Sequence, residues 1–137
     1  DILNENIRLN NIENVTVYSF GLSDRADEIP FVYFKGGSAL ASPVNLINHP
    51  KTEKINCRIE PLDSIFSKSI HRRLDFLKCD VEGCELSVIK GGLETIHREL
   101  PIIMIELYEG WCEQFGYSAV HVRDLLSEMG YAVYLIN

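Results

Sequence analysis

The sequence lacks any long hydrophobic run, because no uncharged stretch approaches the roughly 18 apolar residues of a membrane-spanning helix. It also lacks a basic excess: 13 lysines and arginines stand against 20 acidic residues, a net charge of −7. Such a field repels nucleic acids and anionic lipids. The basic run His71-Arg72-Arg73 is too short for a binding stripe and is typical of a solvated helix end. These absences argue against a membrane span and a nucleic-acid partner.

Metal-binding and nucleotide-binding motifs are also missing. The four cysteines show no CxxC spacing and the four histidines form no HxxxH or HExxH pair, so no metal site is predicted. Reduced, mostly buried thiols are expected, and the expected location of the chain is the cytoplasm. A catalytic thiol would have to be Cys84, which no histidine adjoins. Gly36-Gly37 lacks the GxGxxG pattern of a dinucleotide-binding loop.

What is present is a chain of 137 residues, the size of one domain, with 46 % hydrophobic residues. Residues 1–10 carry apolar positions on one side and predict a helix from the outset. Alternating β-branched and aromatic residues predict strands over 15–20, 29–34 and 54–60. A helix is expected over 62–74, with Asp63 or Ser64 near its cap. Because the chain opens within a helix and ends on a strand, residues 1–137 are expected to be one domain truncated at both ends.

The second half alternates strands and helices. Strands are predicted over 76–80, 102–106 and 131–136, and helices over 85–100 and 120–129. Ser118 and Gly130 are expected as caps of the later helix, and Pro101 ends the earlier one. The apolar run 102–106 is typical of a strand buried on both faces. Right-handed crossovers would make the three strands parallel with helices on both faces, an α/β fold.

Acidic residues follow two of these strands. Asp80 precedes Glu82 and Glu85 after the first strand, and Glu106 ends the second. Ligands bind beyond the carboxyl ends of parallel strands, which lie about 4.8 Å apart, so Asp80 and Glu106 are expected to face one pocket. Asp80 is the stronger functional candidate, whereas Glu85 could equally stabilise the helix dipole. A carboxylate–metal hydrolase using Asp80, Glu82 and Glu106 is a further alternative.

Three glycines are expected to have geometric roles. Gly83 is expected to adopt a positive φ or to allow a close approach of another element. Gly91 and Gly92 lie inside the predicted helix, where each costs roughly 1 kcal/mol relative to alanine. The pair therefore predicts close packing against the sheet or a neighbouring element.

One block of sequence carries a family resemblance. It runs Phe76-Leu-Lys-Cys-Asp-Val-Glu-Gly-Cys-Glu-Leu-Ser-Val-Ile-Lys-Gly-Gly and continues after the helix as Pro101-Ile-Ile-Met-Ile-Glu106. This block resembles the signature of the FkbM family of S-adenosylmethionine-dependent methyltransferases. The opening, with Asn10-Asn11 and Gly21-Leu-Ser-Asp24, is similar to the family's segment after its second strand. The resemblance therefore covers nearly the whole chain.

The resemblance implies a Rossmann-like class I methyltransferase fold with a mostly parallel sheet. It also implies S-adenosylmethionine as cofactor and O-methylation of a hydroxyl on a carbohydrate or secondary metabolite. By position, Leu22 and Ser23 would lie near the adenine and Asp80 near the methionine or methyl end. Asp80 or Glu82 would orient or deprotonate the accepting hydroxyl. An acidic pocket also suits a cationic sulfonium.

On the acceptor side, the resemblance implies that Glu85 and Glu106 contact the substrate. The family's glycine-rich cofactor loop and ribose-binding acid would precede Asp1. We therefore expect these 137 residues alone to bind S-adenosylmethionine weakly or not at all. The alternative function is a noncatalytic interaction module that keeps the α/β scaffold, because function resides in the site and not in the fold.

Overall fold

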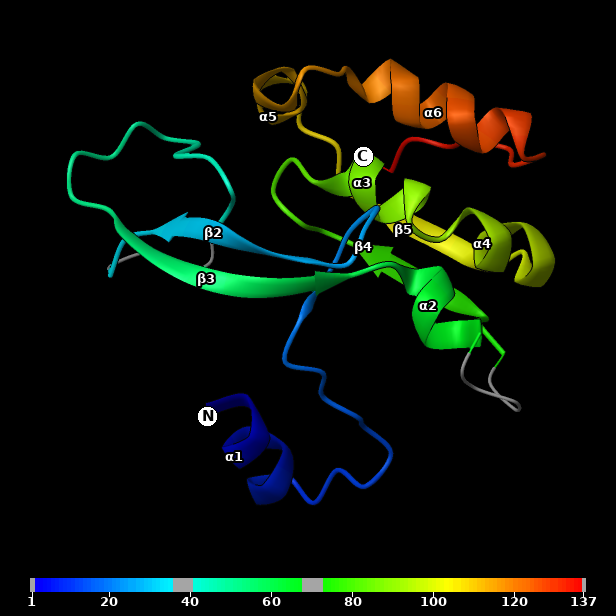
Figure 1. Cartoon of the computed structure of the whole chain (residues 1–137). Helices are drawn as coiled ribbons and strands as arrows, with labels where there is room; N and C mark the ends of the chain where they lie inside the picture. Colours follow the sequence, from blue (N-terminus) through cyan, green and yellow to red (C-terminus); the bar gives the residue numbers. More distant parts are fainter. Residues whose placement is uncertain (1, 36–40, 68–72, 137) are drawn as a thin grey trace.

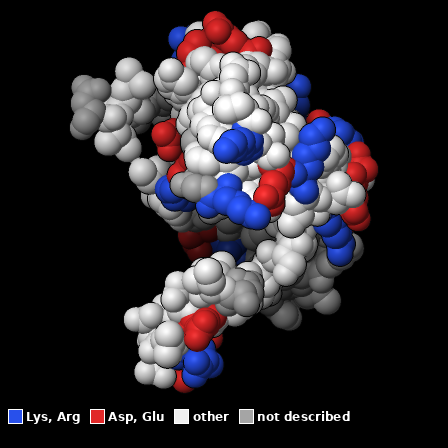
Figure 2. Space-filling model, turned by 90° about the vertical axis from the view of Figure 1, so that its left-hand side faces the viewer, with Lys and Arg blue, Asp and Glu red and all other residues white. Residues whose placement is uncertain are grey.

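The computed structural model describes residues 2–35, 41–67 and 73–136. Two small sheets and several short helices form the body, and α1 (Ile2–Leu9) projects from it on an extended segment (Figure 1). The predicted opening helix is therefore confirmed, but it buries none of its residues. Figure 2 shows the same projection in space-filling form, with acidic and basic side chains interspersed over this face. Gly36-Gly37, and His71-Arg72 of the basic run expected at a solvated helix end, lie outside the described residues.

The first sheet has the order β1-β3-β2. It consists of β1 (Gly21–Leu22), β2 (Asp27–Tyr33) and β3 (Glu53–Glu60). Strand β1 runs parallel to β3, whereas β2 is antiparallel to it. The strands predicted over 29–34 and 54–60 are confirmed, but the sheet is mixed and not parallel.

Two further predicted strands are wrong. Residues 15–20 form no strand in the structure, and residues 131–136 are irregular as well. A strand needs a neighbour that accepts its backbone hydrogen bonds, and no strand in the described part of the chain pairs with either segment. Apolar side chains are exposed in both, with Val15 at 50 % and Leu135 at 93 %.

The second sheet consists of two parallel strands, β4 (Phe76–Cys79) and β5 (Ile102–Ile105). Both strands lie within predicted segments, and their parallel pairing was expected. Most of the other core residues come from helices α2 (Leu62–Ser67), α3 (Glu85–Lys90), α4 (Leu93–Glu99), α5 (Glu109–Cys112) and α6 (Ala119–Glu128). Tyr117, which lies before α6, is also part of the core. A short 3₁₀ helix, η2 (Glu113–Phe115), follows α5. No helix of the described residues is long and apolar enough to cross a membrane.

Only one face of the second sheet is covered by the helices that the structure describes. Leu77 and Cys79 point into the core, whereas alternate positions on the other face are exposed, at 53 % for Phe76 and 71 % for Ile102. Successive side chains of a strand point to opposite faces, so a strand packed on one side shows this alternation. The predictions of a strand buried on both faces and of helices on both faces are therefore wrong for the described residues.

The helix predicted over 85–100 is two helices, α3 and α4, broken at Gly91 and Gly92. A Cβ on Gly91 would lie 1.9 Å from the carbonyl oxygen of Ser23, and one on Gly92 would lie 2.9 Å from a methyl of Leu62. The predicted close packing is confirmed. This packing breaks the helix because the chain turns at the two glycines to fit against Ser23, the residue that follows β1.

Helix ends follow the expected chemistry in α6 but not in α2. Ser118 caps α6 through a capping box with His121, and Gly130 follows the helix with a φ of 93°. Asp63 or Ser64 was expected near the cap of α2, and Asp63 does lie in the first turn of that helix. Its carboxylate instead accepts hydrogen bonds from the backbone N–H groups of Thr95 (2.8 Å) and Glu94 (3.2 Å), in the first turn of α4. Asp63 therefore joins two helices that are distant in sequence.

Candidate functional site

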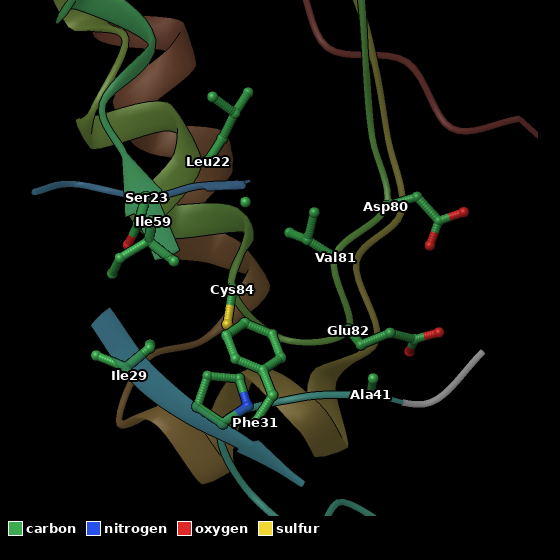
Figure 3. A pocket seen from close by; sticks show the side chains of 12 residues that line it. Leu22, Ser23, Ile29, Phe31, Ala41, Ile59, Asp80, Val81, Glu82 and Cys84 are labelled. Carbon is green, nitrogen blue, oxygen red and sulfur yellow. The ribbon is translucent and has the colours of Figure 1, made fainter. Parts of the chain in front are cut away.

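A pocket of about 240 Å³ lies where the ends of β1 and β4 approach each other. Its apolar walls come mainly from the first sheet and its polar groups from the residues after β1 and β4 (Figure 3). The lining residues are Gly21, Leu22, Ser23, Ile29, Phe31, Ala41, Pro43, Ile59, Asp80, Val81, Glu82 and Cys84. Strands β1 and β4, which belong to different sheets, thus both end at this pocket, and the carboxyl ends of strands are where ligands bind in α/β folds.

The pocket brings together four of the predicted site residues, Leu22, Ser23, Asp80 and Glu82. The carboxylates of Asp80 and Glu82 extend to the same side in Figure 3, past Val81 and away from the apolar wall. Glu85 and Glu106, the predicted substrate contacts, do not line this pocket. The site is therefore apolar on one side and acidic at its edge.

Glu82 is held in an unfavourable conformation. Its φ of 53° is in the left-handed region, which residues with a side chain rarely adopt and which is concentrated at functional sites. Its Oε2 is buried without a hydrogen-bond partner among the described residues. Burial, and then the negative charges of Asp80 and Glu106, raise the pKa of the Glu82 carboxyl above its ordinary value. A strained residue with an unsatisfied buried acceptor is typical of a ligand site.

Asp80 is held in the ionised form. The ammonium Nζ of Lys78 lies 2.7 Å from Asp80 Oδ2, and this hydrogen bond lowers the pKa of the Asp80 carboxyl. Glu106 lies close enough to both Lys78 and Asp80 to affect their electrostatics. Asp80 therefore supplies a fixed negative charge at the pocket edge, and Glu106 lies beside it.

Glu85 supports the loop from behind the pocket. Its side chain is 3 % exposed, and Oε1 accepts hydrogen bonds from the backbone N–H groups of Val81 and Gly83, each at 3.2 Å. The hydroxyl of Tyr117 lies 2.9 Å from both Glu85 Oε2 and the carbonyl oxygen of Gly83. Because this carboxylate is buried and already engaged, the geometry offers no support for its predicted contact with substrate. Its place in the first turn of α3 fits the alternative of a structural role.

Gly83 combines both properties expected of it. Its φ is 94°, and an added Cβ would lie 2.5 Å from the ring of Phe115.

Ser42 was not predicted as a site residue. It is fully buried, and its Oγ donates a hydrogen bond to the carbonyl oxygen of Glu82 at 3.0 Å. No sequence signal links a serine in a loop to a turn 40 residues away.

Two of the alternatives gain no support here. Cys84 lines the pocket, but burial, with the charge of Glu85, raises the pKa of its thiol to about 12, so it is not a nucleophile at neutral pH. Its sulfur is free, as are those of Cys57, Cys79 and Cys112.

Across residues 2–35, 41–67 and 73–136, no three acidic, histidine or cysteine side chains are grouped to hold a metal ion. The carboxylate–metal hydrolase therefore has no structural basis in these residues.

Comparison with known proteins agrees with the sequence signature. The family model of the methyltransferase FkbM domain matches residues 3–133. No curated protein and no solved structure matches the chain significantly. The family match nevertheless spans nearly all of the sequence, including both strand ends that form the pocket. The chain therefore belongs to the methyltransferase family defined by the FkbM domain.

Proposed function

We propose that this chain acts in O-methylation with S-adenosylmethionine, and that the pocket beside Leu22, Ser23 and Glu82 receives the cofactor. The observation that carries this proposal is the buried, unpartnered Oε2 of Glu82 in a left-handed turn at the pocket. A scaffold that only binds another protein has no need to keep such a carboxylate in place. This feature favours the enzyme over the noncatalytic module.

The pocket residues fit part of this cofactor. Leu22, Ile29 and Phe31 offer an apolar wall suited to an adenine ring, and the carboxylates of Asp80 and Glu82 suit a cationic sulfonium. The cavity of about 240 Å³ is smaller than the roughly 300–1,000 Å³ of most ligand pockets. Of the two outcomes expected for these 137 residues alone, weak binding and no binding, the presence of this pocket favours weak binding.

The two carboxylates suit different tasks. When bound, S-adenosylmethionine would supply a methyl group carried on a positively charged sulfur. The acceptor oxygen would bond to the methyl carbon, and the sulfur would be the leaving group. Glu82, whose pKa is raised, is the better general base for the acceptor hydroxyl. Asp80, whose pKa is lowered by Lys78, is the weaker base and contributes charge. Glu106, beside Asp80, is proposed to border the acceptor, and the remaining contribution is alignment of the hydroxyl with the methyl group.

The acceptor is proposed to be a hydroxyl on a carbohydrate or a secondary metabolite, and the site of action to be the cytoplasm. The first proposal comes from the resemblance to the family, and the second from the expectation of reduced thiols, with which the four free cysteines agree. The acidic edge formed by Asp80, Glu82 and Glu106 supports a neutral acceptor over an anionic one, because like charges repel.

The charge of Glu82 is expected to decide a preference between two ligands. S-adenosylhomocysteine lacks the methyl group and the positive charge of S-adenosylmethionine. The wild-type chain is expected to bind S-adenosylmethionine about fivefold more tightly, as for an ion pair near a protein surface. Glu82→Gln removes the negative charge at nearly constant volume and is expected to abolish most of that preference. Backbone amide shifts followed by NMR during titration with each ligand measure both affinities.

Glu113→Gln is the matched control, because it removes the same charge from an exposed residue that does not line the pocket. It should keep the wild-type preference. Equal preferences in wild type and Glu82→Gln would show that Glu82 does not face the sulfonium, and the proposed site would be wrong.

A further inference from the structure

The turn that carries Glu82 is held from the side opposite to Glu85 by a residue of another loop. Ser42 lies on a segment whose backbone is anchored to β2: its carbonyl oxygen accepts the N–H of Val32 at 2.7 Å, and its own N–H donates back at 3.1 Å. The neighbouring residues Ala41 and Pro43 line the pocket. The hydroxyl of Ser42 is thereby fixed against the turn after β4.

The hydrogen bond from Ser42 acts on a single peptide unit. The carbonyl of the Glu82–Gly83 peptide accepts the Ser42 hydroxyl at 3.0 Å, and the N–H of the same peptide donates to Glu85 Oε1 at 3.2 Å. A peptide unit is planar, so two hydrogen bonds at its opposite sides fix its orientation. That orientation sets the ψ angle of Glu82 and, with its left-handed φ, the direction in which its side chain leaves the chain.

The carboxylate of Glu82 has little else to direct it. Its Oε2 is buried without a partner in the described part of the chain, so the backbone has to aim it. A left-handed conformation persists at such a residue only where the surroundings impose it. Glu85 imposes it from the core side and Ser42 from the loop side.

We propose that Ser42 is a positioning residue: by holding the Glu82–Gly83 peptide, it keeps the Glu82 carboxylate directed for methyl transfer. The inference rests on the proposed function for its consequence, because Glu82 matters only if the pocket is the active site. That Ser42 controls the turn does not depend on the proposed function. Measurements on Ser42 variants without a ligand test the control of the turn, and the ligand preference of Glu82→Gln tests the proposed function.

Ser42→Ala removes the hydroxyl and leaves the buried carbonyl of Glu82 without its donor. The freed peptide can rotate, so the Gly83 amide is expected to exchange with solvent about tenfold faster relative to the Val88 amide of α3. The pKa of the Glu82 carboxyl, followed by carbon-13 NMR against pH, is expected to fall toward its ordinary value as the side chain reaches water. Neither measurement needs a ligand.

Thr95→Ala is the matched control, since Thr95 is a buried hydroxyl residue in α4 that does not line the pocket. It should leave the Gly83-to-Val88 exchange ratio and the Glu82 pKa unchanged. Should Ser42→Ala fail to fold, Ser42→Cys keeps the size with a weaker donor, and smaller shifts in the same direction are expected.

Unchanged Gly83 exchange and an unchanged Glu82 pKa in Ser42→Ala would overturn the inference. Equal acceleration of Gly83 and Val88 would also overturn it, because that describes a merely structural serine. If both readouts shift while Glu82→Gln leaves the ligand preference intact, Ser42 still positions Glu82, and it is the proposed function that fails.

Discussion

Gly91→Ala is expected to lower the free energy of unfolding by about 3 kcal/mol. The added Cβ would lie 1.9 Å from the carbonyl oxygen of Ser23 and 2.8 Å from its carbonyl carbon. Both are backbone atoms, so no side-chain rotation relieves the contact. The break between α3 and α4 must then move away from β1, which shifts Ser23 at the pocket wall. Urea unfolding followed by circular dichroism measures the change.

Gly21→Ala is the matched control for this substitution. The same Cβ, added two residues before Ser23, would meet only a side-chain methyl of Ile59 at 3.7 Å, an ordinary contact. Its effect on stability is expected to stay within about 0.5 kcal/mol. If Gly91→Ala were as stable as Gly21→Ala, the close contact between the helix break and Ser23 would not exist in solution.

Glu85→Ala is expected to destabilise the fold by about 3 kcal/mol, because it leaves one buried and one part-buried backbone N–H group without an acceptor. These groups belong to Val81 and Gly83, on either side of Glu82. The same substitution is expected to weaken ligand binding, since the turn that carries Glu82 loses its inner support. Thermal unfolding and the ligand titration described above test the two effects.

Glu85→Gln separates the hydrogen bonds from the bulk of the side chain. Its carbonyl oxygen can still accept from Val81 and Gly83, so it is expected to keep most of the stability. Glu94→Ala, which removes a carboxylate from an exposed position of α4, serves as the control. An equally small loss in Glu85→Ala and Glu94→Ala would contradict the structural role assigned to Glu85.

The part of the fold predicted well from sequence is the part in which short-range patterns decide the structure. The strand before Asp80, the close packing at Gly91 and Gly92 and the capping of α6 follow from residues close together in the chain, although the break of the helix at these glycines was not predicted. The grouping of Leu22 and Ser23 with Asp80 and Glu82 was implied by the family resemblance. The argument from strand ends predicted Asp80 and Glu106 in one pocket, and Glu106 does not line it.

The errors arise where distant residues decide. Residues 15–20 have the composition of a strand, but no strand of the described chain lies beside them. Asp63 has a helix start of its own, yet its carboxylate serves α4. Glu85 and Ser42 owe their roles to a backbone turn whose hydrogen-bond needs are visible only in three dimensions.

The central claim is that the pocket after β1 and β4 binds the methyl donor. The most direct test is a nitrogen-15 NMR map of the 137-residue chain titrated with S-adenosylmethionine to millimolar concentration. The account predicts saturable shifts concentrated on the amides of Leu22, Ser23, Val81 and Glu82, which line the pocket. No shift at these amides, or shifts concentrated on another surface, would contradict it.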